Sequence, residues 1–597
     1  MKKYIIIFSI IAVAFSYSGC NDDAFLTETP TTFYTIDNAF STSEQVDQVL
    51  ISIYFHIREI RANPGETSWI WNLRGNGTDM YDQCDLRLGS TFSDYSIINS
   101  THDTFYQAYC TWYYVIARAN LALYAADLPQ ITWASASSKA YALAQARFFR
   151  AFAYLQLGEL FGGVPIVTEV ASTPRYDYER TSRTETYQFA ISEMEAIIND
   201  LPETTLAGGR IVRGAAQHYL SELYLAMGTQ LAEDGKSGEA QTAFNASINY
   251  ANQLINGSTY NLITERFGRR VNEESFTYPV YKDGVFATAT NNTVVDTVLC
   301  FPNYYWDMFQ EGNVNYQHGN RECIWAIQIN YQAFKSNDNR SRLPYTRVYG
   351  PMLRIGASTW FIGELEDVGG RGVTFANITM YARDDIYEGK FEDDMRNSDV
   401  VFRRRFKGNV SSSPYYCQVV PWDLIYNAYD EATNMNNRSS AYPASCKIAT
   451  DKFTGVSDGE IRSNLFRDDY MVRLAETVLL RAEAKQRNGD KAGAADDINL
   501  LRDRAQCAYR VTAADMDDKF DLILDERARE LVYEEWRWNT LLRMGGNIAV
   551  DRIRKYAFWP RTAQTLTFNY NIWPIPQTVI DSNLDVALPQ NPGWGNR

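Results

Sequence analysis

The apolar positions between residues 468 and 504 recur at the three-and-four spacing of an amphipathic helix, with one interruption. The tripeptide Asn488-Gly489-Asp490 falls at this interruption. Glycine readily adopts the left-handed conformation that ends a helix, and Asp490 can accept the first free amides of a following one. The pattern therefore predicts two helices joined as a hairpin. Their apolar faces consist of Met471, Leu474, Ala475, Val478, Ala482, Ala494, Ile498, Leu501 and Ala505.

The same spacing of small and large apolar residues occurs earlier in the chain. Gly228, Ala240 and Phe244 have the offsets of the first hairpin, with a glycine-containing turn between the first two. This is the pattern of a tetratricopeptide unit, which needs stacked neighbours to bury its face. A third hairpin, interrupted by an insertion, is predicted for residues 142–163 and 186–200. We expect a stack of helical hairpins.

The middle of the chain has a different pattern. Helical periodicity also occurs near the N-terminus, at residues 42–60 and 104–127. Between residues 266 and 467, by contrast, no helical stripe is sustained. Alternating segments such as ECIWAIQIN indicate short strands there. The predicted fold is mainly α: tetratricopeptide-like hairpins with an irregular, loop-rich subdomain. The expected divisions are a signal peptide (1–19), an N-terminal helical region (20–265), a variable ligand-binding subdomain (266–467) and a C-terminal helical region (468–597).

The first twenty residues predict export. Lys2 and Lys3 precede an apolar run of residues 4–15, and Ser18-Gly19 stands directly before Cys20. This pattern is typical of a lipoprotein signal, which is too short to span a bilayer and is removed on export. We expect Cys20 to be lipidated and to anchor the protein to a membrane. The alternative is an ordinary secretory signal that is cut at another site.

Composition and charge fit an exported globular protein. The 597 residues are 45% hydrophobic, enough for a large core. The formal charge is −15, and removal of Lys2 and Lys3 with the signal makes it −15 − 2 = −17. Because an acidic surface repels polyanions, we expect no nucleic-acid partner.

Cysteines and histidines form no recognisable metal motif. The cysteines after Cys20 are widely spaced and contain no CxxC pair. Spacing alone leaves Cys300–Cys323 and Cys417–Cys446 as possible bridges. We therefore expect no cofactor, although oxygen atoms of the many Asp and Asn side chains could hold a structural calcium ion.

Two stretches mix aromatic and short polar side chains without a regular period, at residues 68–85 and 301–320. A sugar presents an apolar C–H face, which a flat ring can cover, and a polar rim, which amides, carboxylates and guanidiniums can bind. The alternative is that the same rings fill a loop-rich core. The candidate ligand-binding residues are Trp69, Trp71, Asn72, Arg74, Asp79, Tyr304, Tyr305 and Trp306.

A charged helix near the C-terminus bears on the alternative that the protein is an enzyme. Glu526, Glu530 and Glu534 follow one another at four-residue spacing, which places carboxylates about 6 Å apart. That separation is close to the one in a retaining glycosidase. However, neighbouring arginines would keep these carboxylates ionised, whereas a catalytic acid needs a raised pKa. We therefore expect ion pairs and no catalytic residue here.

Four segments together resemble the SusD/RagB family of outer-membrane nutrient-binding lipoproteins. They are ARFFRAFAYLQLGELFGGVPIVTE (146–169), YMVRLAETVLLRAEAKQRNGD (470–490), ILDERARELVYEEWRWNTLLRMG (523–545) and IWPIPQTVIDSNLDVALPQNPGW (572–594). They follow the lipoprotein cysteine in this order. The resemblance implies a SusD-like helical scaffold and a surface-exposed lipoprotein of the cell outer membrane.

The same resemblance implies a non-enzymatic function: binding of a glycan and its delivery to a TonB-dependent transporter of the SusC type. The hairpin scaffold is implied to face the transporter. Binding of a peptide, as in RagB-like proteins, is the first alternative. A surface glycoside hydrolase and a pure assembly scaffold are the others.

Overall fold

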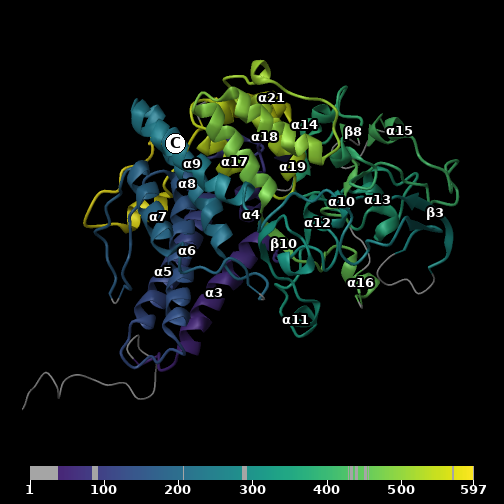
Figure 1. The fold of residues 1–597 in the computed structure, drawn as a ribbon. Helices are drawn as coiled ribbons and strands as arrows, with labels where there is room; N and C mark the ends of the chain where they lie inside the picture. The colour runs from purple at the N-terminus through teal and green to yellow at the C-terminus, as the bar shows by residue number, and fades with distance from the viewer. Residues whose placement is uncertain are drawn as a thin grey trace, which may run out of the picture.

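The computed structural model describes residues 38–83, 92–171, 173–205, 207–285, 292–427, 429–430, 435–436, 441–449, 453–454, 456–567 and 570–595. Cys20, the leader and Cys84 lie outside this range. One half of the molecule consists of long helices packed side by side, and the other half of short helices, short strands and loops (Figure 1). The C-terminal helices lie across the top of the view, between the two halves.

The long helices form the predicted hairpins. Helices α6 and α7, α8 and α9, and α17 and α18 pack against each other as antiparallel neighbours, and α9 also packs on α17. The prediction was wrong at one boundary: residues 469–473 form a strand, so Met471 does not belong to the helix. The bounds are α3 (Ser43–Ala62), α5 (Asp103–Ala126), α6 (Ala136–Phe161), α7 (Arg183–Ile197), α8 (Arg213–Glu233), α9 (Ser237–Ile255), α17 (Leu474–Arg487) and α18 (Lys491–Arg504).

Local sequence accounts for the turns between these helices. Gly489 has a φ of 87°, the left-handed conformation expected after a helix. The Asp490 side chain accepts a hydrogen bond of 2.8 Å from the Gly493 amide and so caps α18. At the start of α7, Ser182 and Glu185 form a reciprocal capping box. The predicted hairpin signals are therefore confirmed as helix ends.

The subdomain is held together by two-stranded antiparallel pairs that often join distant parts of the chain. The pair β4–β10 joins the subdomain to the C-terminal region, and β1–β5 joins it to the N-terminal region. The strand predicted in ECIWAIQIN is confirmed as β4. The strands are β1 (Tyr81–Asp82), β2 (Phe276–Tyr281), β3 (Val294–Cys300), β4 (Cys323–Ile327), β5 (Asn377–Ile378), β6 (Phe402–Arg403), β7 (Tyr429–Asp430), β8 (Met435–Asn436), β9 (Ala444–Ser445) and β10 (Asp469–Arg473).

Short helices fill the rest of the subdomain and the C-terminal region. Residues 68–74, expected to be a loop, form helix α4 instead. The shorter helices are α4 (Ser68–Arg74), α10 (Tyr304–Asp307), α11 (Tyr331–Lys335), α12 (Tyr345–Tyr349), α13 (Leu353–Gly356), α14 (Met380–Arg383), α15 (Trp422–Asn427), α16 (Asp458–Ile461), α19 (Asp521–Leu531), α20 (Arg537–Arg543), α21 (Ile548–Tyr556), α22 (Pro560–Thr565) and α23 (Gln577–Ser582).

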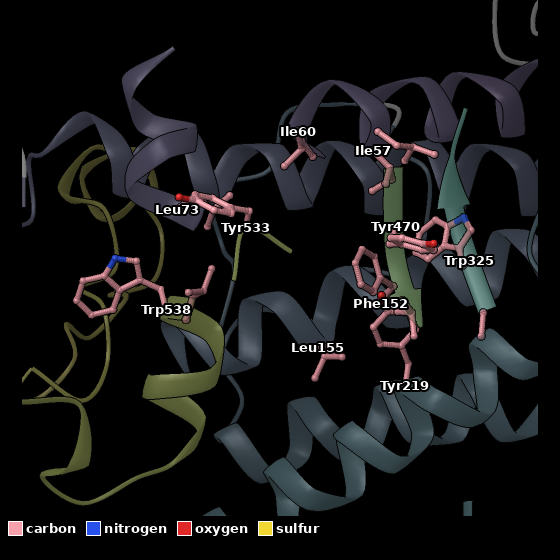
Figure 2. Packing of buried hydrophobic residues seen from close by; sticks show 14 of the residues in the cluster. Ile57, Ile60, Leu73, Phe152, Leu155, Tyr219, Trp325, Tyr470, Tyr533 and Trp538 are labelled. Atoms are coloured by element: carbon pink, nitrogen blue, oxygen red, sulfur yellow. The ribbon is translucent and has the colours of Figure 1, made fainter. Parts of the chain in front are cut away.

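The hydrophobic core runs through both halves without a break. Trp325 of β4 is inserted between helices, with its ring centroid 5.8 Å from that of Phe152 and 6.3 Å from that of Tyr219. Tyr470, on the paired strand β10, lies beside it (Figure 2). Because one strand pair carries aromatic rings into the helical stack, the subdomain and the scaffold share a core.

Neither suggested disulfide forms. Cys323 and Cys417 are free cysteines in the part of the chain that the structure describes, which excludes both Cys300–Cys323 and Cys417–Cys446. Cys323 instead packs within the main hydrophobic cluster as a small apolar side chain.

The close contact between α8 and α9 generates a stability prediction. A Cβ on Gly228 would come within 2.6 Å of Phe244, closer than real contacts allow. Gly228→Ala is therefore expected to lower the free energy of unfolding by about 1–3 kcal/mol, since the core is already packed. Urea unfolding followed by circular dichroism measures the change.

Gly238 supplies the matched control, because a Cβ there meets no atom within 4 Å. Gly238→Ala is expected to raise the free energy of unfolding by about 0.5–1 kcal/mol through helix propensity alone. If both variants changed stability in the same direction, close packing at Gly228 would not be the cause.

Candidate functional site

The first predicted stretch, on helix α4, divides between surface and core. Trp69 is half-buried, whereas Trp71 is 9% exposed and stacks on Phe375 with ring centroids 4.5 Å apart and planes 12° apart. Residues two apart on a helix point to different sides, so the two tryptophans do not form one platform. Phe375, which sequence analysis missed, takes the place of the second ring.

The polar residues of this stretch point into the protein. Asn72 donates a hydrogen bond of 2.9 Å to Thr104 Oγ1. Arg74 donates to the carbonyl oxygen of Tyr533 at 2.8 Å and lies over the ring of Tyr345. These side chains are 2–3% exposed, so they are not accessible to a ligand here and their role is structural.

Asp79 is also enclosed. Its Oδ2 lies 2.6 Å from Arg537 Nη2 and 3.0 Å from Arg552 Nε, and the residue is fully buried. Burial alone would raise the pKa of Asp79, but the two guanidiniums hold it below its usual range. Asp79 therefore holds the N-terminal region to the C-terminal helices.

The second predicted stretch lies on α10. The Tyr304 hydroxyl donates to the carbonyl oxygen of Arg504 at 2.7 Å, and the Tyr305 hydroxyl to that of Glu530 at 3.0 Å. Both rings are buried. Like Arg74 and Asp79, these tyrosines attach their segment to the C-terminal helices, so the structure brings the two stretches together as scaffold rather than as a ligand platform.

Trp306 borders a cleft, the Trp306 cleft, of about 400 Å³ in the subdomain. Its ring stacks on Phe276 with centroids 4.9 Å apart, and the Arg270 guanidinium lies 4.5 Å from its centroid. Polar groups in the cleft already contact one another: Glu311 Oε2 accepts from the Thr454 hydroxyl at 2.9 Å. These two polar groups of the cleft are thus already hydrogen-bonded within the protein.

A larger groove of about 680 Å³ lies on the helical half, between α5, the loop after α6 and the segment around α23. We call it the tyrosine groove. Its polar groups are likewise engaged: the Tyr113 hydroxyl donates to the Pro165 carbonyl at 2.6 Å, and Asn583 exchanges two 2.9 Å hydrogen bonds with the Tyr178 backbone. The tyrosines that line it are Tyr106, Tyr109, Tyr113, Tyr176 and Tyr178.

A third surface combines a half-buried ring with a partly exposed guanidinium group. We call Glu66, Trp71, Arg347 and Phe375 the Phe375 face. Arg347 Nε lies 2.8 Å from Glu66 Oε2, and the guanidinium carbon is 5.8 Å from the Phe375 centroid. Phe375 is half-buried and the Arg347 side chain 34% exposed. Sequence analysis marked only Trp71 of this face, because Arg347 and Phe375 are far from it in the chain.

Two family models match the chain. One, described as the SusD family, covers residues 315–594, and the other, described as starch-binding associating with outer membrane, covers residues 26–225. The chain belongs to the SusD family. This confirms the resemblance found in the sequence.

Curated relatives and solved structures agree with this assignment. The starch-binding protein SusD of Bacteroides thetaiotaomicron is 25% identical over 499 residues, which are 81% of this chain and 78% of the relative. The SusD-like protein P2 of Formosa agariphila is 22% identical over the full length of both chains.

Among solved structures, a SusD homologue from Bacteroides thetaiotaomicron has a TM-score of 0.65 at 16% identity, covering 94% of this chain and 98% of its own. Surface glycan-binding protein A from Bacteroides thetaiotaomicron, solved in complex with laminarihexaose, has a TM-score of 0.56 at 17% identity, covering 92% and 99%. These likenesses establish the fold.

The charged helix of this SusD-family chain is entirely engaged in ion pairs. Glu526 lies 2.8 Å from Arg396 and 3.0 Å from Arg502. Burial opposes ionisation, yet the surrounding guanidiniums lower the pKa of Glu526 to about 2. The pKa of Glu530 is also well below its usual range, for the same reasons. The expected ion pairs are confirmed, and they lie inside the protein rather than on its surface.

Neither a metal site nor a membrane span is found in the described ranges. Within them, no group of three or more His, Cys, Asp or Glu side chains could hold a metal ion. Nothing there supports the calcium alternative. Of the helices described, none is both long and apolar enough to cross a bilayer.

The lowered pKa of Glu526 predicts a pH dependence of stability. The unfolded carboxyl has a pKa of about 4.3, so ionisation of Glu526 stabilises the fold above that pH by about 3 kcal/mol. The contribution is lost as the pH falls towards 2. Glu526→Gln should therefore lower the free energy of unfolding by about 3 kcal/mol at pH 7 and by roughly half as much at pH 3, measured by urea unfolding.

The exposed Glu274 provides the control. Glu274→Gln is expected to change the free energy of unfolding by less than about 0.5 kcal/mol at either pH. An equal loss at pH 7 and pH 3 in Glu526→Gln would show that packing, and not charge, is what the carboxylate contributes.

Proposed function

We propose that this SusD-family chain is a non-catalytic lipoprotein of the cell surface that binds an oligosaccharide and delivers it to a partner TonB-dependent transporter of the SusC type. The binding site is the Phe375 face, in the subdomain that was expected to hold the ligand, together with the end of α4. The names of the relatives support the ligand class, since one is a starch-binding protein and another was solved with laminarihexaose.

The observation that carries the proposal is the pairing of a stacked ring with a partly exposed guanidinium. Phe375 can cover the C–H face of a sugar ring, while the Trp71 ring behind it fixes its orientation. Arg347 has five N–H donors and pairs with Glu66 through Nε, and its side chain remains 34% exposed, so part of the guanidinium is accessible to hydroxyl groups. Tyr113 and Asn583 in the tyrosine groove, and Glu311 and Thr454 in the Trp306 cleft, form hydrogen bonds within the protein instead.

The carboxylates support the non-catalytic part of the proposal. Glycoside hydrolysis needs a general acid whose pKa is raised and which reaches the substrate. Burial raises the pKa of Asp82 to about 6 and those of Glu159 and Asp367 to about 7. All three are at most 4% exposed, so a saccharide on the surface cannot reach them.

Delivery requires a surface for the transporter, and the helical half offers one. Helix α5 presents exposed aromatic rings at Tyr106, Tyr114 and Tyr124, and Tyr176 adds another beside it. Large exposed rings are enriched in protein interfaces. We assign the transporter contact to this helical half, whereas the Phe375 face binds the ligand. Cys20 holds the protein at the outer membrane through its lipid.

The main alternative is a peptide ligand, as in RagB-like proteins. An extended peptide would need an unpaired strand edge or a deep apolar groove. The tyrosine groove is the surface that fits this alternative. A control variant in that groove therefore separates glycan binding at the Phe375 face from peptide binding in the groove.

Binding of glycans tests the proposal directly. The protein lacking residues 1–20 is expected to be retarded in gels that contain one of amylopectin, laminarin, polygalacturonate or κ-carrageenan, without release of reducing sugar. Phe375→Leu keeps apolar volume but removes the flat ring. It should weaken the retardation about tenfold, because a sugar–ring stack contributes about 1–1.5 kcal/mol.

Tyr176→Ala is the matched control, because it removes an exposed ring of the tyrosine groove. It should leave glycan affinity within about twofold. A loss in Tyr176→Ala but not in Phe375→Leu would move the site to the groove. Release of reducing sugar by the wild-type protein would contradict the non-catalytic function.

A further inference from the structure

Four arginines converge beside the Phe375 face, from separate segments of the subdomain. Arg347 lies on α12, Arg354 on α13, Arg371 in the turn after Gly370, and Arg462 at the end of α16. Figure 1 shows α12, α13 and α16 together in the loop-rich half. The charges of Arg347, Arg371 and Arg462 all lower the pKa of Arg354, so the four lie close together. We call these four residues the arginine cluster.

Main-chain hydrogen bonds hold the cluster in place. The Arg371 amide donates to the Arg462 carbonyl at 2.6 Å, and the Thr374 amide donates to the Arg347 carbonyl at 3.2 Å. Arg371 and Phe375 belong to the same short segment of the chain. The positions of the guanidiniums relative to the ring are therefore set by the backbone.

Two carboxylates are paired with the cluster. Glu364 lies 3.0 Å from Arg371 Nε and 2.7 Å from Arg462 Nη1, and Glu66 lies 2.8 Å from Arg347 Nε. Arg354, by contrast, forms no ion pair within the described residues. Arg342 adds a further positive charge beside Glu66. The whole chain carries −15, so a group of arginines at one place runs against the rest of the molecule.

Arg354 is the member that forms no ion pair within the described residues. Its buried Nε has no hydrogen-bond partner among the described residues, and the side chain is only partly accessible to solvent. Burial lowers the pKa of Arg354, Glu364 raises it, and the charges of Arg371, Arg462 and Arg347 lower it again. Keeping the charged guanidinium of Arg354 next to three others therefore costs free energy.

We propose that the arginine cluster is the subsite for an anionic group of the saccharide, a carboxylate or a sulfate ester, next to the ring-binding Phe375 face. This inference rests on the proposed function for the saccharide itself and adds its chemical class. A guanidinium presents parallel N–H donors that match two oxygens of either anion. Bound there, the anion supplies a negative charge beside Arg354, which forms no ion pair within the described residues. Arg347 belongs to both surfaces and links the anion to the sugar ring that carries it.

Arg354→Gln provides the sharpest test, because it removes the charge of Arg354 and breaks no ion pair that the structure contains in its described part. The thermal unfolding midpoint should stay unchanged or rise. Affinity for the anionic probes should fall at least tenfold, measured by affinity electrophoresis and isothermal titration calorimetry. Polygalacturonate carries only carboxylates and κ-carrageenan only sulfates, so the preferred probe identifies the anion.

Salt dependence gives a second readout. Raising NaCl from 50 to 500 mM should weaken binding of the preferred anionic probe at least tenfold in the wild type, and much less in Arg354→Gln. Arg269→Gln is the matched control, since the Arg269 side chain is 60% exposed and borders the Trp306 cleft instead. It should leave the affinity within twofold.

The outcomes separate this inference from the proposed function. Retardation by amylopectin or laminarin and by neither anionic probe would overturn the anionic subsite and leave oligosaccharide binding intact. Binding of an anionic probe that Arg354→Gln leaves unchanged, or that Arg269→Gln abolishes, would overturn the placement at the arginine cluster. Absence of binding to all four polysaccharides would overturn both proposals.

Discussion

The fold depends on a buried network of ion pairs around Arg473 and Glu530. Arg473 lies 2.6 Å from each of Glu322, Glu530 and Glu534. Glu530 also pairs with Arg396 and Arg504. These residues come from the subdomain, strand β10, helices α18 and α19 and the turn after α19. A buried charge without its partner costs about 3–5 kcal/mol, so every segment that supplies one partner is fixed in position by the others.

This network explains why so many polar side chains of the N-terminal half are unavailable for binding. Arg74, Asp79 and Tyr305 all end at the segment formed by residues 530–537, through backbone carbonyls or through Arg537. They connect the N-terminal region and the loop-rich subdomain to a C-terminal segment whose own charges are already paired. Residues that look like sugar-binding groups in the sequence are here the attachments that let an irregular subdomain share a core with a helical scaffold.

What remains on the surface is correspondingly informative. Rings and guanidiniums that are partly exposed gather at the Phe375 face and the arginine cluster, where Glu66 pairs with Arg347 and Glu364 with Arg371. The surroundings of Arg473 and Arg354 differ: three carboxylates lie against Arg473, whereas Arg354 lies near three other guanidiniums and forms no ion pair within the described residues. The first arrangement stabilises a fold. The second is suited to receive an anion.

Sequence by itself determined the helical hairpins, because their apolar period, the Asp490 cap and the glycine at the turn are local signals. It also determined the family, and the ionised state of the glutamates on α19, since Arg527 and Arg529 stand beside them in the chain. Only the tertiary structure decided which aromatic and polar residues face solvent. The residues next to Trp71 and Trp306 in the chain are of the types that bind sugars. Whether the two rings are buried depends, however, on residues that pack against them from far away in the sequence. Phe375, Arg347 and Arg354 carry no local signal, because their meeting is produced by long-range strand pairing such as β1 with β5.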